Sequence, residues 1–266
     1  MKKLLAIELG KLKKLNTLRV LLLVYFALSP LVAYAFYYIL NKFLGPLLGA
    51  DWNPFAAPDV WALVTYSSSW FNVLMGVIVV VVMTNEYSYK TLKQNVIDGM
   101  SLSQVIGGKF IIVFLLSTII TIYTFLMGMV FGVVNTENAD IWDGFSKIPV
   151  YYLQTLCYFS FAFFFATLVK RSALSIIFFI VSFIVEAIIG GVLTVTKLEV
   201  IYAFFPLNAF SQLTPFPVLR QTIDAANERT GEIPFMLDSW MNILVCITYM
   251  ILFFFISFWV IKRRDL

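Results

Sequence analysis

The sequence predicts an all-α membrane protein with six transmembrane helices. Of its 266 residues, 61% are hydrophobic and only 13% are charged, and the mean hydropathy is +0.90. Soluble domains are about half apolar and about a quarter charged, so one buried core cannot hold this excess of apolar side chains. The apolar residues are concentrated in six long runs that are separated by more polar segments. Hydrocarbon therefore has to surround much of this protein.

Each apolar run has the length of about 20 residues that one helical crossing requires. Helices are favoured because a segment within hydrocarbon has to satisfy its own backbone hydrogen bonds. Alternating strands of about 9–11 residues, which form membrane barrels, do not occur in this sequence. We expect residues 1–266 to form a single transmembrane domain. Its predicted spans cover about residues 20–40, 61–84, 110–134, 148–169, 173–195 and 240–261.

The first run has an alternative interpretation as a secretory signal peptide. Ala33-Tyr34-Ala35 matches the small-x-small pattern of a cleavage site. However, the apolar stretch continues through Leu40, and the segment before it is long for the basic region of a signal. We therefore expect this run to be retained as a span.

The charges are distributed unevenly between the two sides of the predicted bundle. Six spans place both termini on one side, and that side holds 14 of the 19 Lys and Arg residues but only four of the 15 acidic ones. Loops rich in Lys and Arg remain in the cytoplasm. We expect a multi-pass protein of the cytoplasmic (inner) membrane with both termini in the cytoplasm.

Residues 1–16 predict a short amphipathic helix at the membrane surface. Its leucines share one arc of the helix, and most of its lysines lie outside that arc. Glu8 falls within the leucine arc, where an ion pair with Lys11 would compensate its charge. Lys11 and Lys14 would lie near lipid phosphates, and contact with a cytoplasmic partner is an additional possibility that the sequence leaves open.

The polar segment after the second run predicts a helix from Glu86 to Ile97 on the cytoplasmic face. Asp98-Gly99 is a stop signal for such a helix. Ser101 and Gln104 match the capping box that starts a new helix, which would run into the third span. A helix with these boundaries is typical of an exposed element that binds another protein. A short helix that only lies at the membrane interface is the alternative.

Residues 196–239 predict a broken segment on the outer side. Its first half is too apolar for a solvated loop, and Pro206, Pro215 and Pro217 prevent a continuous span. A re-entrant or surface-lying pair of short helices satisfies both constraints, provided that its backbone groups are buried in protein. The polar second half would cover the outer mouth.

Polar residues inside the spans are candidates for a pathway. A charge at the depth of Glu186 costs about 3 kcal/mol, so this side chain should face protein or water, or be protonated. Ser175 and Ser182 share its helix face, while Ser68 and Asn72 form a second polar patch in another span. For both groups, two roles are open: a lining of a substrate or proton path, or structural hydrogen bonds between helices.

The composition excludes several kinds of site. The sequence has no histidine, so histidine-based metal sites and catalytic triads are absent. Cys157 and Cys246 fall within apolar runs, where buried thiols are favoured over a disulfide or a metal site. Gly107-Gly108-Lys109 lacks the first glycine and the final Ser or Thr of a phosphate-binding loop. We expect no catalytic residue, no metal and no cofactor on this chain, and no nucleic acid as a partner.

This layout resembles that of the type-2 ABC transporter permeases, the membrane subunits of exporter-like ATP-binding cassette systems. The resemblance covers the whole chain and is most specific in the segment Glu86…Lys90-Thr91-Leu92…Ser101…Gly108-Lys109. The segment is similar to the family's pattern of Glu, a Gly-Thr pair, Ser-Arg and Gly-Lys. Lys90 and Leu102 depart from this pattern at positions where Gly and Arg are common.

The resemblance implies that residues 86–97 are a coupling helix, received by a groove in a separate ATPase subunit that binds ATP and Mg²⁺. Two ATPase copies and a second permease copy or a paralogue would complete the complex. It would export a substrate or transmit force to an extracytoplasmic partner. A self-sufficient secondary transporter or channel that uses Glu186 as an ion or proton site is the alternative. The implied coupling residues are Glu86, Tyr89, Lys90, Thr91, Leu92, Lys93 and Gln94.

Overall fold

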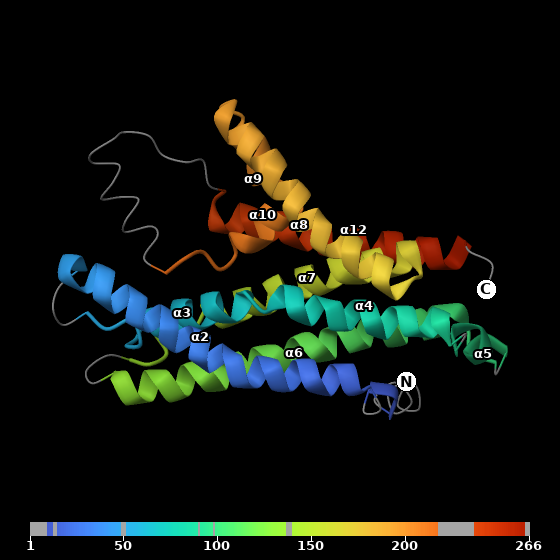
Figure 1. The fold of residues 1–266 in the computed structure, drawn as a ribbon, viewed down its shortest axis with the longest axis horizontal. Helices are drawn as coiled ribbons and strands as arrows, with labels where there is room; N and C mark the ends of the chain where they lie inside the picture. Colours follow the sequence, from blue (N-terminus) through green and yellow to red (C-terminus); the bar gives the residue numbers. More distant parts are fainter. Residues whose placement is uncertain are drawn as a thin grey trace.

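The computed structural model describes residues 10–12, 15–48, 52–89, 91–97, 99–136, 140–217 and 237–263. These residues form helices and connecting turns, with no strand among them. Figure 1 shows most of the long helices side by side in one elongated bundle. The prediction of an all-α protein is therefore confirmed.

In the described part of the chain, five single helices are long and apolar enough to cross a membrane, and a bent pair of helices counts as a sixth crossing if it forms one span. Each predicted span falls within one of these segments, so a multi-pass membrane protein is supported. The single helices are α2 (Asn16–Leu48), α6 (Leu102–Asn135), α7 (Lys147–Val169), α8 (Ser172–Val195) and α12 (Ser239–Arg263). The bent pair consists of α3 (Asp59–Ser69) and α4 (Asn72–Ser88).

The second span differs from its prediction because it is broken. We expected a continuous helix over residues 61–84, but α3 and α4 meet at an angle of 46°. Two serine hydroxyls just before the break donate to carbonyl oxygens of the preceding turn: Ser67 to Val64 at 3.1 Å and Ser69 to Tyr66 at 2.7 Å. Such side-chain bonds compete with the backbone for these carbonyls and bend helices.

Helix α7 forms the centre of the bundle. It packs against α3, α4, α6, α8 and α12, and large side chains such as Tyr151, Phe159 and Phe163 are fully enclosed. Helix α8 is different, because it leans away from the bundle (Figure 1) and exposes isoleucines and valines along much of its length. Apolar side chains that are exposed in this way match a lipid-facing surface.

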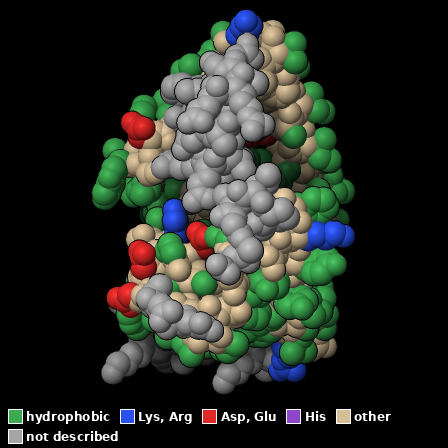
Figure 2. Space-filling view, turned by 90° about the vertical axis from the view of Figure 1, so that its left-hand side faces the viewer, with side chains coloured by type: hydrophobic (Ala, Val, Ile, Leu, Met, Phe, Trp, Pro, Cys, Tyr) green, Lys and Arg blue, Asp and Glu red, His purple; other side chains and the backbone are tan. Residues whose placement is uncertain are grey.

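Among the described residues, three short helices accompany the long ones: α5 (Thr91–Ile97), α9 (Glu199–Ala203) and α10 (Pro206–Ser211). Helix α5 lies at the end of the bundle at which α2 begins and α12 ends, and we call this the α5 end (Figure 1). The link between α7 and α8 also reaches it, because the Lys170 ammonium lies 5.4 Å from the ring centroid of Tyr87 in α4. Figure 2 views the opposite end, where charged side chains are scattered among hydrophobic ones.

Candidate functional site

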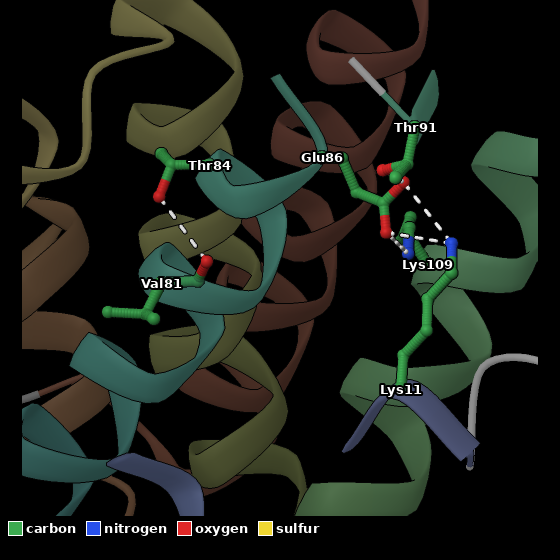
Figure 3. A network of polar contacts seen from close by, with 6 residues as sticks. All are labelled: Lys11, Val81, Thr84, Glu86, Thr91 and Lys109. Atoms are coloured by element: carbon green, nitrogen blue, oxygen red, sulfur yellow. Dashed lines mark hydrogen bonds and ion pairs between the residues drawn. The ribbon is translucent and has the colours of Figure 1, made fainter. Parts of the chain in front are cut away.

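Glu86 is the centre of a polar cluster at the α5 end. Its Oε1 lies 2.7 Å from the Lys109 ammonium and 3.0 Å from the Lys11 ammonium. Its Oε2 accepts a hydrogen bond of 2.6 Å from the Thr91 hydroxyl. Figure 3 shows these side chains approaching one carboxylate from separate segments of the chain. We call Glu86, Thr91, Lys109 and Lys11 the Glu86 cluster.

Two members of the Glu86 cluster, Glu86 and Lys109, are almost completely buried. The side chains of Glu86 and Lys109 are 5% and 2% exposed, whereas that of Lys11 is 33% exposed. A buried charge is tolerated only when it is paired and hydrogen-bonded, and here both carboxylate oxygens have partners. The cluster therefore ties α4, α5, α6 and the N-terminal segment together at one point.

The helix that we predicted from Glu86 to Ile97 begins later in the structure. Helix α4 continues through Glu86 to Ser88, and α5 begins at Thr91. The polar residues after position 84 do not end α4 because the charge of Glu86 is compensated inside the bundle. Glu86 is thus an internal anchor of α5, and its buried side chain is not presented at the surface as an exposed contact.

The C-terminal boundary of α5 agrees with the sequence prediction. Gly99 has a φ of +93°, its N–H donates to Val96, and the N–H of Met100 donates to Asn95 at 3.0 Å. This is the Schellman arrangement that ends helices at a glycine. The Ser101 hydroxyl and the Gln104 side chain then form the predicted capping box at the start of α6.

The other predicted coupling residues lie on or beside α5. Tyr89 is 73% exposed, and Gln94 is also exposed. Leu92 and Lys93 belong to the α5 helix, but their side chains lie outside the described residues, as does Lys90. Ile97, at the end of α5, adds a further exposed apolar side chain, at 73%.

Only part of the predicted N-terminal helix can be compared with the structure. Residues 10–12 are helical, and Lys11 bonds to Glu86, which lies 75 positions away in the sequence. Glu8 and Lys14 lie outside the described residues. No local pattern in the sequence signals the contact between Lys11 and Glu86.

Glu186 binds the short helix α10. Its two carboxylate oxygens accept hydrogen bonds from the backbone N–H groups of Leu207 at 3.1 Å and Asn208 at 2.7 Å. These groups belong to the first turn of α10, where N–H groups have no partner within the helix. Of the two roles that the sequence left open, this contact is a structural hydrogen bond, and its donors are backbone groups.

Three further side chains, which belong to α7 and α12, bond to the segment that contains α9 and α10. Each donates to a backbone carbonyl near the end of α9 or α10, so buried carbonyl groups that the short helices leave open are satisfied. The donors and acceptors are Gln154 to Phe210 at 2.9 Å, Asn242 to Ala209 at 3.1 Å and Tyr249 to Phe204 at 2.9 Å.

The polar stripe on α8 faces the bundle as its spacing predicts. Ser175, Glu186 and Gly190 are buried, and Ser182 is half-buried. The Ser182 hydroxyl donates to the carbonyl of Phe179 in its own helix at 2.6 Å. Ser175 has no hydrogen-bond partner within the described part of the chain.

Ser68 and Asn72 flank the break between α3 and α4, and both are buried. Asn72 Oδ1 accepts from the Thr155 hydroxyl of α7 at 3.3 Å. The Ser68 hydroxyl and the Asn72 amide nitrogen have no hydrogen-bond partner in the described ranges. The patch is therefore interior, and its hydrogen bond leads to α7, whereas the hydrogen bonds of Glu186 lead to α10.

Cys157 and Cys246 are free and buried, in agreement with their predicted role as small apolar side chains. The described residues contain no group of three or more Cys, Asp or Glu side chains arranged to hold a metal ion.

Comparison with known proteins gives one family for most of the chain. The family described as "Protein of unknown function (DUF2705)" matches residues 56–266. No curated protein matches the sequence. The matched region contains α3 to α12, and so includes all members of the Glu86 cluster except Lys11.

Proposed function

The chain belongs to the DUF2705 family, whose description states no function, and from the geometry of the Glu86 cluster and α5 we propose that it is the permease subunit of an ABC transporter. A separate ATPase, present in two copies, would bind ATP and Mg²⁺ and drive this subunit. A second copy of the chain or a paralogue would complete the pathway. The complex would export a substrate or pass force to an extracytoplasmic partner.

One observation carries the proposal: α5 is an exposed short helix that is fastened to two long helices at a single buried point. Thr91, the first residue of α5, bonds to Glu86 of α4, and Glu86 bonds to Lys109 of α6. Because these contacts are short and buried, a displacement of α5 would be transmitted to both long helices. A coupling helix requires this property.

The exposed side chains of α5 and its N-terminal link supply a surface for a groove in the ATPase. Tyr89 and Ile97 are large apolar side chains with 73% exposure each, and Gln94 lies between them in the sequence. Exposed aromatic and apolar side chains are typical anchors of protein interfaces. In this proposal Tyr89, Gln94 and Ile97 contact the ATPase, while Glu86 and Thr91 transmit the motion.

The distribution of charge supports an orientation with the α5 end in the cytoplasm. Loops and termini predicted on this side carry 14 of the 19 Lys and Arg residues. An ATPase in the cytoplasm would then have direct access to α5. The membrane in question would be the cytoplasmic (inner) membrane.

The segment α9–α10 would be the re-entrant outer part of the permease. Its backbone is held by side chains of α7, α8 and α12, which is what a non-spanning segment at membrane depth needs. A change in the tilt of these three helices would therefore move α10. Because α4 and α6, which hold α5, pack against α7, this gives a physical route from α5 to the outer side of the bundle.

The alternative of a secondary transporter that uses Glu186 as an ion site is less well supported. Both carboxylate oxygens of Glu186 accept backbone N–H groups of α10. An ion at this position would have to compete with two fixed donors. The geometry favours a structural role for Glu186 within a permease.

The test is purification of the tagged chain from its native membrane in mild detergent, with identification of co-purifying proteins and an ATPase assay. We expect a stoichiometric ATPase that carries a phosphate-binding loop. Gln94→Pro should reduce both co-purification and ATPase activity, because proline removes a backbone N–H from the middle of α5. Gln94→Ala removes the same side chain, which contacts the ATPase in this proposal, but keeps the helix, so the additional loss in Gln94→Pro measures the effect of breaking α5.

Two results would contradict the proposal. One is a homo-oligomer that transports its substrate without any ATPase. The other is a Gln94→Pro variant that inserts, binds its ATPase and supports normal ATP-driven transport.

A further inference from the structure

A cluster of polar side chains lies inside the bundle, around the break between α3 and α4. Each member is at most 1% exposed, and α2, α6 and α7, which carry several of them, all pack against α3. Polar groups at this depth have to find their partners inside the protein. We call these residues the Tyr25 cluster. Its members are Tyr25 of α2, Ser68 of α3, Asn72 of α4, Thr124 of α6, and Tyr151 and Thr155 of α7.

The Tyr25 hydroxyl is the meeting point of the cluster. It lies 2.9 Å from the Thr124 hydroxyl, to which it is hydrogen-bonded. The side chains of Ser68 and Tyr151 are also close enough to interact electrostatically with it. However, the hydroxyl groups of Ser68 and Tyr151 have no hydrogen-bond partner in the described part of the chain. Both groups therefore lie beside Tyr25 without a direct hydrogen bond.

A third group without a partner belongs to Asn72. Its Oδ1 accepts a hydrogen bond from the Thr155 hydroxyl at 3.3 Å, whereas its amide nitrogen has no partner among the described residues. Thr155 lies one turn after Tyr151 on α7, and its hydroxyl also bonds to the Tyr151 carbonyl at 3.0 Å. Asn72 follows Ser68 directly across the break. The open groups of Ser68, Asn72 and Tyr151 thus belong to one buried site.

The chemistry of these three groups selects the ligand. Each of them can donate a hydrogen bond, and the two hydroxyls can also accept one. Water does both, is neutral, and is held when a buried site offers it about two to four polar partners. The Tyr25 cluster has no charged side chain, so an ion would enter the bundle without a countercharge and at a high cost. Buried donors that stay unpaired cost more than the immobilisation of one water.

The break between α3 and α4 gives independent support for water. Residues 67–72 contain neither proline nor glycine, yet the two helices meet at an angle of 46°. Water that inserts beside a helix is one cause of such bends, and it acts together with the serine hydroxyls that bond within α3. Polar groups that are near one another without a direct hydrogen bond are commonly bridged by water.

We propose that the Tyr25 cluster binds buried water, which bridges the Ser68 and Tyr151 hydroxyls and the Asn72 amide at the break between α3 and α4. The water connects both halves of the broken span to α7, in addition to the direct bond between Asn72 and Thr155. The angle between α3 and α4 is held in part by this hydrated contact. The site does not depend on the ABC transporter assignment, because it uses only the packing of the bundle.

The first test uses the wild-type chain in lipid nanodiscs and needs no variant. A brief X-ray pulse converts water into hydroxyl radicals, which oxidise side chains beside bound water even where bulk solvent does not reach. We expect oxidation of Tyr25 and Tyr151, detected by peptide mass spectrometry. Phe159 is the internal control, because it is aromatic, belongs to α7 and is fully buried. It should remain unmodified.

The second test asks which side chains hold the water. Ser68→Ala and Asn72→Leu each remove one partner, and we expect the oxidation of Tyr151 to be lost or strongly reduced in both. Ser68→Ala deletes a single oxygen atom, so it keeps the test decisive if Asn72→Leu does not fold. Ser160→Ala is the matched control, because Ser160 is fully buried on α7 and its hydroxyl bonds within that helix to the Cys157 carbonyl at 2.8 Å. Its oxidation pattern should equal that of the wild type.

Four outcomes would overturn the proposal. Unmodified Tyr25 and Tyr151 in the wild type would exclude bound water. Equal oxidation of Phe159 and Tyr151 would indicate general entry of solvent into the bundle, and equal effects of Ser68→Ala and Ser160→Ala would remove the site. A melting temperature that rises with sodium chloride but not with choline chloride, and no longer does so in Asn72→Leu, would assign the site to a sodium ion.

Discussion

The Lys109 ammonium lies 2.7 Å from Glu86 Oε1, and both side chains are at least 95% buried. The two residues are 23 positions apart, on either side of α5. Their ion pair closes the connection between α4 and α6, and α5 projects from that connection. The shape of the α5 end therefore depends on this contact.

The stability losses from removing Glu86 and from removing Lys109 should not be additive. Glu86→Ala removes the carboxylate that lies 2.7 Å from the buried Lys109 ammonium, and breaking a buried pair in this way costs about 3–5 kcal/mol. We expect a marked fall in the melting temperature of the purified protein. In Glu86→Ala/Lys109→Ala the loss should be smaller than the sum of the single effects. Strict additivity would show that the two side chains do not act as a pair.

Thr91 should control how firmly α5 is held. Thr91→Val keeps the side-chain shape but removes a hydrogen bond to a charged acceptor, for which about 1.5–3 kcal/mol is typical. We expect faster hydrogen exchange in α5 and little change in the central helix α7. Thr91→Ser retains the hydroxyl and serves as the control. Unchanged exchange in Thr91→Val would mean that other contacts position α5.

Glu186 should control the order of α10. In Glu186→Gln an amide N–H₂ replaces one carboxylate oxygen, so it meets the backbone donor of Leu207 or Asn208 and leaves that donor unpaired. An unsatisfied buried donor costs about 1–3 kcal/mol, and hydrogen exchange at residues 206–211 should increase. Ser182→Ala is the control on the same helix face, because the Ser182 hydroxyl bonds only within α8 in the described structure. Equal behaviour of the two variants would rule out the anchoring role of Glu186.

Two glycines of α6 should respond in opposite directions to the same substitution. A Cβ on Gly128 would lie 2.8 Å from the indole ring of Trp61 in α3, whereas a Cβ on Gly107 would have no atom within 4 Å. Gly128→Ala should destabilise the protein by about 1–3 kcal/mol through overpacking. Gly107→Ala should stabilise it by about 0.5–1 kcal/mol, because alanine is the better helix former. Thermal unfolding of the two variants under identical conditions decides this, and a similar shift in both would contradict the α3–α6 packing.

The approximate positions of the six crossing segments and the boundary between α5 and α6 could be predicted from local sequence. The apolar runs have the length of a membrane crossing, and Gly99, Ser101 and Gln104 are local signals that end one helix and start the next. The inward direction of Ser175, Glu186 and Gly190 also followed from helical spacing. These features depend on residues that are neighbours along the chain.

Other features were decided by tertiary structure. The break between α3 and α4 and the continuation of α4 through Glu86 depend on how neighbouring segments satisfy polar groups. The partners of Glu86 and Glu186 are up to 75 and 22 positions distant, so no periodic pattern reveals them. The sequence alone thus determined that this is a helical membrane protein with six apolar runs, and that the polar segment after the second run contains a helix stop signal followed by a helix start signal. Only the packed bundle decided which buried charge meets which partner, because low-dielectric surroundings make each such pairing obligatory.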